Sequence, residues 1–291
     1  MPRAAEARAD AVPTSSIAAA HEMVDRSADA PSIRRTLAGL HRYRHLLRNL
    51  VLKDLKLKYR GSVIGFLWSL ANPILMAAIY TLAFTRFLDQ QTEHFVFYLM
   101  LGLLAWTFFA TSASMSTGAI VDNGGLVKSV SFPRAILPTA TVLFNLTQYM
   151  LSVLVILPLM LAWYRVTPSG PMLLFPVFVA LQLIFTVGIA MILATGAAFL
   201  RDVRHFVEIA LTVLFWMTPI VYMAHKVPEP YRQAILLSPV SPYVAAYHDI
   251  FYFQRWPAAG IWATTVGYAI IAATVGLWLI VRHEDRFAEQ V

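Results

Sequence analysis

The chain has 291 residues, of which 58% are apolar and only 13% are charged, and its mean hydropathy is +0.63. Ordinary soluble domains carry roughly 25% charged residues and cannot hide this much apolar surface in one core, so the composition argues against a water-soluble enzyme. We therefore expect an integral membrane protein. In such a protein the net charge of +7 indicates cytoplasmic loops rich in Lys and Arg, and no nucleic-acid partner is expected.

Residues 1–36 are predicted to form a disordered cytoplasmic tail. They are rich in Ala, Ser and charged side chains, and no apolar stretch of a signal peptide follows the early arginines. From residue 37 to 60, apolar side chains recur at three- and four-residue steps, with Lys, Arg and His on the opposite faces. This pattern predicts a basic amphipathic helix at the cytoplasmic membrane interface; a basic helix packed on a soluble partner is the alternative.

The rest of the chain, residues 61–285, is predicted to be a six-helix transmembrane domain. Its apolar segments are long enough to cross about 30 Å of hydrocarbon. With both termini inside, 18 of the 23 Lys and Arg residues fall on the cytoplasmic side, which is the positive-inside pattern. Residues 286–291 form a second cytoplasmic tail. The six predicted spans are 63–84, 95–117, 138–162, 172–199, 206–223 and 258–281.

Two connections look like more than tethers. In the inner loop 118–137, Asp122 and Asn123 are predicted to cap a short helix that ends at Phe132-Pro133. The outer segment 224–257 has five prolines and two apolar stretches of about ten residues or fewer, which are too short to span. We expect these stretches to form a re-entrant helical pair in the outer leaflet; a lid of folded extracytoplasmic helices is the alternative.

The chain lacks the residues that several other classes of protein require. The only charged side chain in the six segments is Glu208, which is explained by a helical ion pair with Arg204. Without intramembrane carboxylates or histidines as relays, a secondary transporter is disfavoured, and transport should depend on ATP. There is no G-x-x-x-x-G-K-[ST] phosphate loop, so the chain cannot hydrolyse a nucleoside triphosphate by itself. The neighbours His248 and Asp249 should point apart on a helix, so we expect no catalysis there.

Aromatic and hydroxyl side chains form two stripes at helical spacing, on the first and fifth predicted spans. Ring faces stack on sugars and hydroxyls exchange hydrogen bonds with them, so a glycan conduit is one interpretation. Packing of helices, interfacial anchoring and hydrogen bonds to the preceding helical turn explain the same residues without a substrate. The candidate conduit residues are Phe66, Tyr80, Phe84, Phe215, Thr218 and Tyr222.

Five stretches, in order within about residues 40–285, resemble the permease subunits of polysaccharide-export ABC transporters, which are type-2 ABC exporters of O-antigen, capsule or teichoic acid chains. They are specific as a set, although no single one would suffice. The stretches are Leu47–Leu75, with G-x-x-W-x-x-x-x-P at Gly65, Trp68 and Pro73; Asp122–Pro138; Phe199–Ile209; Phe215–Tyr222; and Ser238–Tyr252.

This resemblance implies a transporter subunit, not an enzyme, working as a homodimer in the bacterial cytoplasmic (inner) membrane. Two copies of a separate ABC ATPase would dock below it and bind ATP and magnesium, while this chain would bind no cofactor or metal. The implied cargo is a polysaccharide linked to undecaprenyl diphosphate in contact with membrane lipid. A permease of the same fold for a drug, lipid or lipo-oligosaccharide is the alternative, and an integral membrane glycosyl- or acyltransferase is a more distant one.

Two further groups of candidate residues follow from the resemblance. The inner loop would contact the ATPase, and the basic helix would attract the lipid diphosphate electrostatically, although the positive-inside rule alone explains part of its charge. The candidate ATPase-coupling residues are Asp122, Asn123, Gly124, Leu126, Lys128, Phe132 and Arg134, and the candidate lipid-diphosphate residues are Arg48, Lys53, Lys58 and Arg60.

Overall fold

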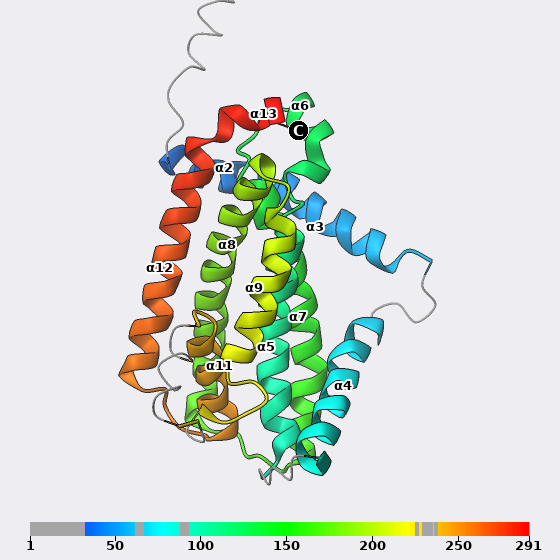
Figure 1. Ribbon diagram of the computed structural model, residues 1–291, viewed down its shortest axis with the longest axis vertical. Coiled ribbons are helices and arrows are strands. Elements are labelled where there is room, and N and C mark those ends of the chain that lie inside the picture. The colour runs from blue at the N-terminus through cyan, green and yellow to red at the C-terminus, as the bar shows by residue number, and fades with distance from the viewer. Residues whose placement is uncertain are drawn as a thin grey trace, which may run out of the picture.

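The computed structural model of the chain describes residues 33–61, 67–87, 93–224, 227–228, 235 and 238–290, and all regular structure within these ranges is helical (Figure 1). Four of its helices are long and apolar enough to cross a membrane. The prediction of an all-helical membrane protein is therefore confirmed. The four long helices are α5 (Phe95–Ser116), α7 (Ile136–Trp163), α8 (Phe175–Phe199), which follows the turn η3 (Gly170–Leu174), and α12 (Ala259–Arg282).

Two shorter helices occupy the places of the first and fifth predicted spans. The first is α4 (Leu67–Thr81), which continues as the π-helical segment η1 (Leu82–Phe87). The second is α9 (Val203–Met217), which ends six residues before the predicted boundary. Its end has a local cause, because Pro219 lacks a backbone donor and disfavours helical backbone at Thr218, which is extended at φ −91° and ψ 131°.

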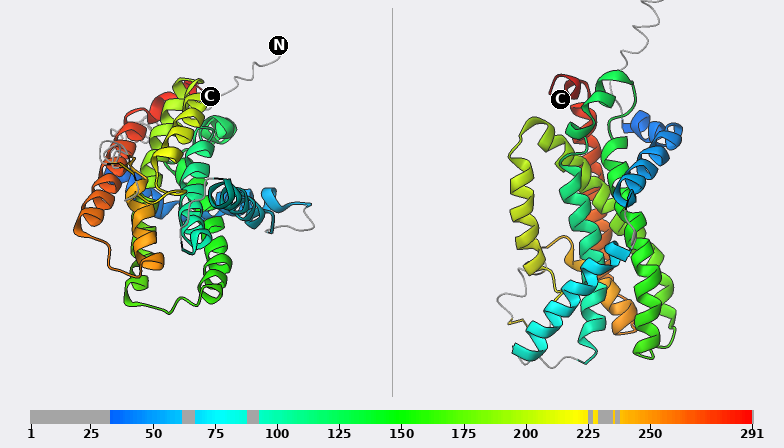
Figure 2. Two further views of the ribbon diagram at one scale, coloured as in Figure 1. Left: turned by 60° about the horizontal axis from the view of Figure 1, so that its bottom comes forward. Right: turned by 90° about the vertical axis from the view of Figure 1, so that its right-hand side faces the viewer.

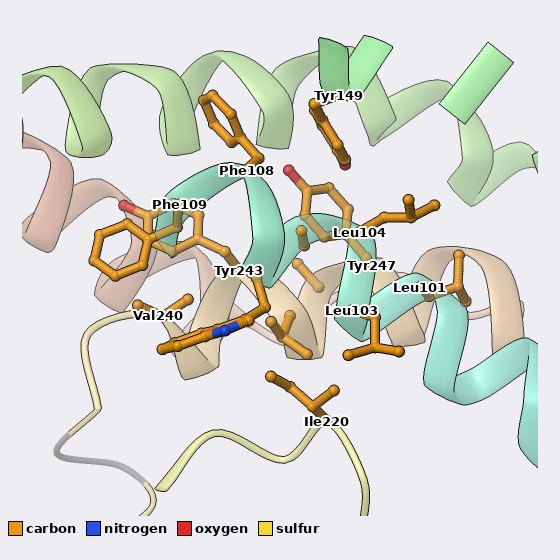
Figure 3. Packing of buried hydrophobic residues seen from close by; sticks show 14 of the residues in the cluster. Leu101, Leu103, Leu104, Phe108, Phe109, Tyr149, Ile220, Val240, Tyr243 and Tyr247 are labelled. Atoms are coloured by element: carbon orange, nitrogen blue, oxygen red, sulfur yellow. The ribbon is translucent and has the colours of Figure 1, made fainter. Parts of the chain in front are cut away.

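Helix α5 is the centre of the bundle. Its residues are apolar on all sides and most are buried, which is the pattern of a helix enclosed by other helices. Helices α4, α7, α8, α9 and α11 (Ser241–Tyr247) all contact it. Figure 3 shows the aromatic part of this core, where Tyr243 and Tyr247 of α11 lie near Phe108 and Phe109 of α5, and Tyr149 of α7 stacks on Phe108.

Helices α8 and α12 form the closest pair in the bundle, and they run side by side in both figures of the whole chain (Figures 1 and 2). Their backbones meet where Gly188 of α8 faces Gly276 and Ala272 of α12. A Cβ atom at either glycine would overlap backbone atoms of the other helix. Close approach through small residues is a common way for membrane helices to gain van der Waals contact.

The amphipathic segment differs from its prediction. Two helices, α2 (Ile33–Arg42) and α3 (Arg44–Tyr59), replace the single helix expected over 37–60, and they meet at Tyr43, whose hydroxyl donates to the Ser131 carbonyl. The tail predicted to be disordered through residue 36 already contains the first residues of α2, where Thr36 is buried. Residues 1–32 of that predicted tail lie outside the described residues.

The two short segments at the ends of the bundle also take defined structures. At the end bearing α11, the second predicted apolar stretch, 243–253, forms α11 together with the π-helical segment η5 (His248–Tyr252), while most of the first stretch lies outside the described residues. That the two stretches re-enter the membrane stays a prediction. At the opposite end, η6 (Glu284–Arg286) and α13 (Phe287–Gln290) replace the predicted tail over 286–290. Phe287 is fully buried there because it packs in the cluster of the inner loop.

Candidate functional sites

Aromatic side chains of α4, α5 and α9 meet around one cleft. Tyr80 of α4 stacks on Phe215 of α9 with 5.7 Å between ring centroids, and Trp106 of α5 meets Phe215 edge-on at 5.6 Å. Phe84 extends the series from Tyr80, at 6.5 Å. The cleft has a volume of about 370 Å³ and is also lined by the exposed Thr212. The structure therefore brings together the stripes that were predicted separately on the first and fifth spans.

Two predicted conduit residues lie elsewhere, and a third is not described. Phe66 is outside the described residues. Thr218 and Tyr222 do not continue the face of α9, and that part of the prediction is wrong because the helix ends at Met217. Thr218 is fully buried, and its hydroxyl interacts with the Leu214 carbonyl and the Ser238 hydroxyl. The Tyr222 hydroxyl donates to the Trp216 carbonyl.

The inner loop forms the turn η2 (Val121–Asn123) and the helix α6 (Gly124–Ser129) at one end of the bundle, beside α13 (Figure 1). The predicted side-chain cap is absent, because the Asn123 amide donates back to Ala119 and Asp122 pairs instead with Arg204 at 3.7 Å. Arg204 therefore approaches Asp122, not the predicted partner Glu208. Helix α6 ends at Ser129, before the predicted Phe132-Pro133 boundary.

Some side chains of this loop pack against their own chain, and others are exposed. Val127 and Phe132 are buried in their own chain, in a cluster with Phe287, so they present no apolar wedge to a partner in this conformation. The backbone amide of Arg134 donates to the Glu284 carboxylate at 2.8 Å, which ties the loop to the C-terminal segment. The residues of the η2–α6 segment that remain exposed are Val121, Asp122, Gly125, Lys128 and Ser129, and Val130 beyond it is exposed as well.

The cations of the predicted lipid-diphosphate interface have different surroundings. Arg48 and Arg60 are exposed, and Lys53 is 3.6 Å from the carboxylate of its neighbour Asp54. Lys58 instead reaches α7, where its amine donates to the side-chain carbonyl of Gln148 and lies 5.8 Å from the centre of the Phe144 ring. Of the four cations, only Lys58 is seen to contact a membrane-spanning helix.

A polar stripe on α7 was missed by the sequence reasoning. Thr141, Asn145, Gln148 and Ser152 recur at four-, three- and four-residue steps, which place them on one face of the helix. The last three are buried against the middle of the molecule although they lie in an apolar span. The three- and four-residue spacing is visible in the sequence and could have indicated this face, but a search limited to charged residues does not find it.

The neighbours His248 and Asp249 point apart, as expected. The His248 ring stacks on Tyr98 at 3.6 Å and exchanges a hydrogen bond with the Tyr98 carbonyl. The buried Asp249 carboxylate pairs with Arg255 at 2.7 Å. His248 thus holds the outer segment to α5, whereas the Asp249–Arg255 pair lies within that segment. Among the described residues, no group of three His, Asp or Glu side chains is arranged to bind a metal ion.

Comparisons with known proteins agree on one family. Residues 45–252 match the family model described as ABC-2 type transporter. The chain is 34% identical over 259 residues to the O-antigen export system permease protein RfbA of Myxococcus xanthus, a match covering 88% of this chain and 99% of the relative. A Klebsiella pneumoniae protein of the same name is 32% identical, over 81% of this chain and 91% of its own. The polysialic acid transport protein KpsM of Escherichia coli is 24% identical, over 66% and 75%.

Proposed function

Because the chain belongs to the ABC-2 type transporter family, we propose that it is the membrane permease subunit of an ATP-driven exporter of an O-antigen-like polysaccharide. Such a subunit is the membrane component of a transporter and contains no catalytic domain. The cargo we propose is a polysaccharide attached to undecaprenyl diphosphate. This lipid-linked cargo, the stoichiometry of the assembly and the orientation of the termini are our inferences beyond the family itself.

The observation that carries the proposal is the aromatic cleft between α4, α5 and α9. A polymer that must slide needs many weak and similar contacts, and ring faces supply them without gripping one charged group. Tyr80, Trp106 and Phe215 offer such faces side by side. Charged side chains are costly inside a membrane, and none lines this cleft. In the present conformation the Tyr80 and Phe215 rings contact each other, so a sugar chain would have to separate them and stack between them.

The energy for transport must come from a partner, since the chain has no phosphate loop. We place two copies of an ABC ATPase, with their ATP and magnesium, against the end of the bundle that bears α6. The exposed Asp122 and Lys128 there offer polar contacts, and Val121 and Val130 offer exposed apolar ones. A second copy of this chain would complete the conduit, because one chain contributes only one aromatic wall.

We further propose six membrane passages with both ends of the chain in the cytoplasm. The path of the chain supports this arrangement, since α2 and α13 lie at the same end of the bundle (Figure 1). With both ends of the chain inside, 18 of the 23 Lys and Arg residues fall on the cytoplasmic side, as the positive-inside rule expects. Helix α4 would cross together with η1, and α9 together with the non-helical residues that follow it. The membrane would be the bacterial inner membrane.

The test is the material that accumulates when this chain is removed. Cells lacking it should accumulate lipid-linked polysaccharide on the cytoplasmic face of the membrane. Antibody labelling of the polysaccharide, compared between inverted and right-side-out membrane vesicles, measures on which face it lies. Expression of the chain with its ATPase should clear it, and an ATPase variant that binds but does not hydrolyse ATP should not. Normal surface polysaccharide in the deletion strain would refute the proposal. Loss of export of a small lipid or drug, with normal polysaccharide, would favour the alternative cargo.

A further inference from the structure

Helix α6 has few supports of its own. It is only six residues long, which is too short for a helix to be stable through its own hydrogen bonds. Only Val127 among its side chains is buried. The pair formed by Asp122 and Arg204 beside it is exposed to solvent, so it stabilises the segment little. The orientation of α6 therefore depends on what Val127 packs against.

The C-terminal segment supplies that contact. Apart from the adjoining turn η2, α13 makes the most extensive contact with α6 among the described helices (Figure 1). Its first residue, Phe287, is fully buried in the same apolar cluster as Val127 and Phe132. Since a four-residue helix at the end of a chain has no stability of its own, the place of α13 against α6 depends on the burial of Phe287.

The same segment is fixed to three of the long helices. The Glu284 carboxylate accepts from the backbone amide of Arg134, two residues before α7 begins. The ring of Phe199, the last residue of α8, lies 5.3 Å from the His283 ring and 5.8 Å from the Phe287 ring. The segment follows α12 after a single residue, His283. It thus links the inner loop to α7, α8 and α12 at once.

Two routes connect α6 with the rest of the bundle. Along the chain, α6 lies between α5 and α7. Through Phe287 it also reaches α8 and α12, whose backbones meet at Gly188 and Gly276. Without the second route, a movement of α6 would reach the α8–α12 pair only indirectly, through α5 and α7.

We infer that the C-terminal segment, η6 with α13, positions α6 for the ATPase, and that Phe287 is the positioning residue. The inference rests on the proposed function, which places the ATPase against α6. With Phe287 in its cluster, Gly125 and Lys128 are held on the exposed side of α6. A push on α6 is then transmitted to α8 and α12 as well as to α5 and α7. Without this ring the push is lost in movement of α6 itself, and ATP is hydrolysed without driving export.

The first measurement is the contact between α6 and the ATPase. The full chain carrying Gly125→Cys is assembled with its ATPase in nanodiscs, and the yield of crosslink between them is determined. Phe287→Ala should lower this yield about fivefold in fully assembled complexes, because the packed orientation of α6 becomes less populated. Phe287→Leu keeps a buried apolar side chain and should preserve the yield. Gln290→Ala replaces an exposed side chain of α13 and is the control.

The second measurement separates positioning from stability. ATP hydrolysis and polysaccharide export are measured on the same proteoliposomes, and their ratio is compared between variants. Phe287→Ala should raise the ATP hydrolysed per polysaccharide exported about tenfold, a factor within the usual range of coupling between two sites. A variant that is only unstable would lose both activities with the amount of assembled complex and would keep the wild-type ratio.

Glu284→Ala is a second variant that decides the question if Phe287→Ala does not assemble. It removes the acceptor of the Arg134 amide and leaves the apolar cluster intact. The ratio should rise in the same direction but by less, about threefold, the scale of one lost hydrogen bond. Wild-type ratios and crosslink yields in both variants would overturn the inference. Loss of both activities in proportion to the assembled complex would also overturn it, because Phe287 would then only complete the core.

Export by the wild type tests the proposed function separately. If the wild type exports polysaccharide and the variants match it in ratio and crosslink yield, this inference fails and the proposed function stands. If the wild type exports no polysaccharide but Phe287→Ala still lowers the crosslink yield at Gly125→Cys, the proposed cargo is wrong and this inference stands. Absence of that crosslink with the otherwise unchanged chain would overturn the inference, because the ATPase would then lie elsewhere.

Discussion

Tyr80 of α4 and Phe215 of α9 stack with 5.7 Å between their ring centroids and 27° between their planes. The two residues lie on helices that are far apart in the chain, and the contact joins the two aromatic stripes into one surface. Under the function proposed above, a sugar that stacks on one of these rings would displace the other.

The first prediction concerns these rings. Tyr80→Ala and Phe215→Ala should each slow polysaccharide export about fivefold, because removal of one stacking ring costs roughly 1 kcal/mol. Tyr80→Phe should export normally, since it keeps the ring that stacks on Phe215. The measurement is the rate of appearance of surface polysaccharide after induction. Trp163→Ala is the control, because this ring is 77% exposed at the end of α7. Normal export by both alanine variants would assign the rings to packing alone.

The second prediction concerns the ATPase contact. The natural chain has no cysteine, so single cysteines can be introduced without further changes. Lys128→Cys and Gly125→Cys should crosslink to the ATPase subunit, since both positions are exposed on α6. Val127→Cys should neither crosslink nor react with a polar maleimide, because the Val127 side chain is only 1% exposed. Free labelling of position 128 without crosslinking, in an assembled and active complex, would place the ATPase elsewhere.

The third prediction concerns the α8–α12 contact. Gly188→Ala should destabilise the chain by about 1–3 kcal/mol, because the added methyl group overlaps the backbone of Ala272 and the helices must separate. Gly267→Ala on the same α12 is the matched control, since its Cβ would meet no atom within 4 Å. That variant should be as stable as the wild type or more so, because alanine favours helix. Thermal unfolding in detergent measures both; equal stability of the two variants would contradict the packing.

The fourth prediction concerns pH and the C-terminal segment. Burial raises the pKa of the Glu284 carboxyl, and the Arg134 amide and guanidinium offset only part of this effect. The folded chain therefore binds this proton at higher pH than the unfolded chain does. Its contribution to stability is complete below the unfolded pKa, about 4.3, and is lost as pH rises through the folded value.

Glu284→Gln removes this titration while its side-chain oxygen still accepts from the Arg134 amide. The unfolding temperature of the variant, relative to the wild type, should therefore increase between pH 4 and pH 8. If the difference in unfolding temperature between Glu284→Gln and the wild type is constant over this range, or decreases, titration of the buried Glu284 carboxyl is not its cause.

The sequence by itself determined the class of the protein. The length of an apolar run depends only on local composition, so the ends of α5, α7, α8 and α12 could be located to within three residues. The resemblance of the loops around Asp122 and Ser238 to one exporter family was likewise readable without coordinates, and the family match confirms it. The break at Tyr43 was not located, because a turn between two helices is decided by what the adjoining residues contact. The end of α9 at Thr218 was missed although its cause, Pro219, is local and visible in the sequence.

Only the tertiary structure decided which side chains meet. Phe132 lies in a loop and Phe287 lies near the end of the chain. Both are nevertheless buried in one cluster, because α13 packs against the inner loop. Lys58 was one of several equivalent cations in the sequence and became distinct through its contact with Gln148. Tyr80 and Phe215 each had the right spacing on their own helices, but stacking requires the two helix faces to turn towards each other. The relative orientation of the two helix faces is set by packing between segments that are distant in the chain, so it cannot be inferred from local composition.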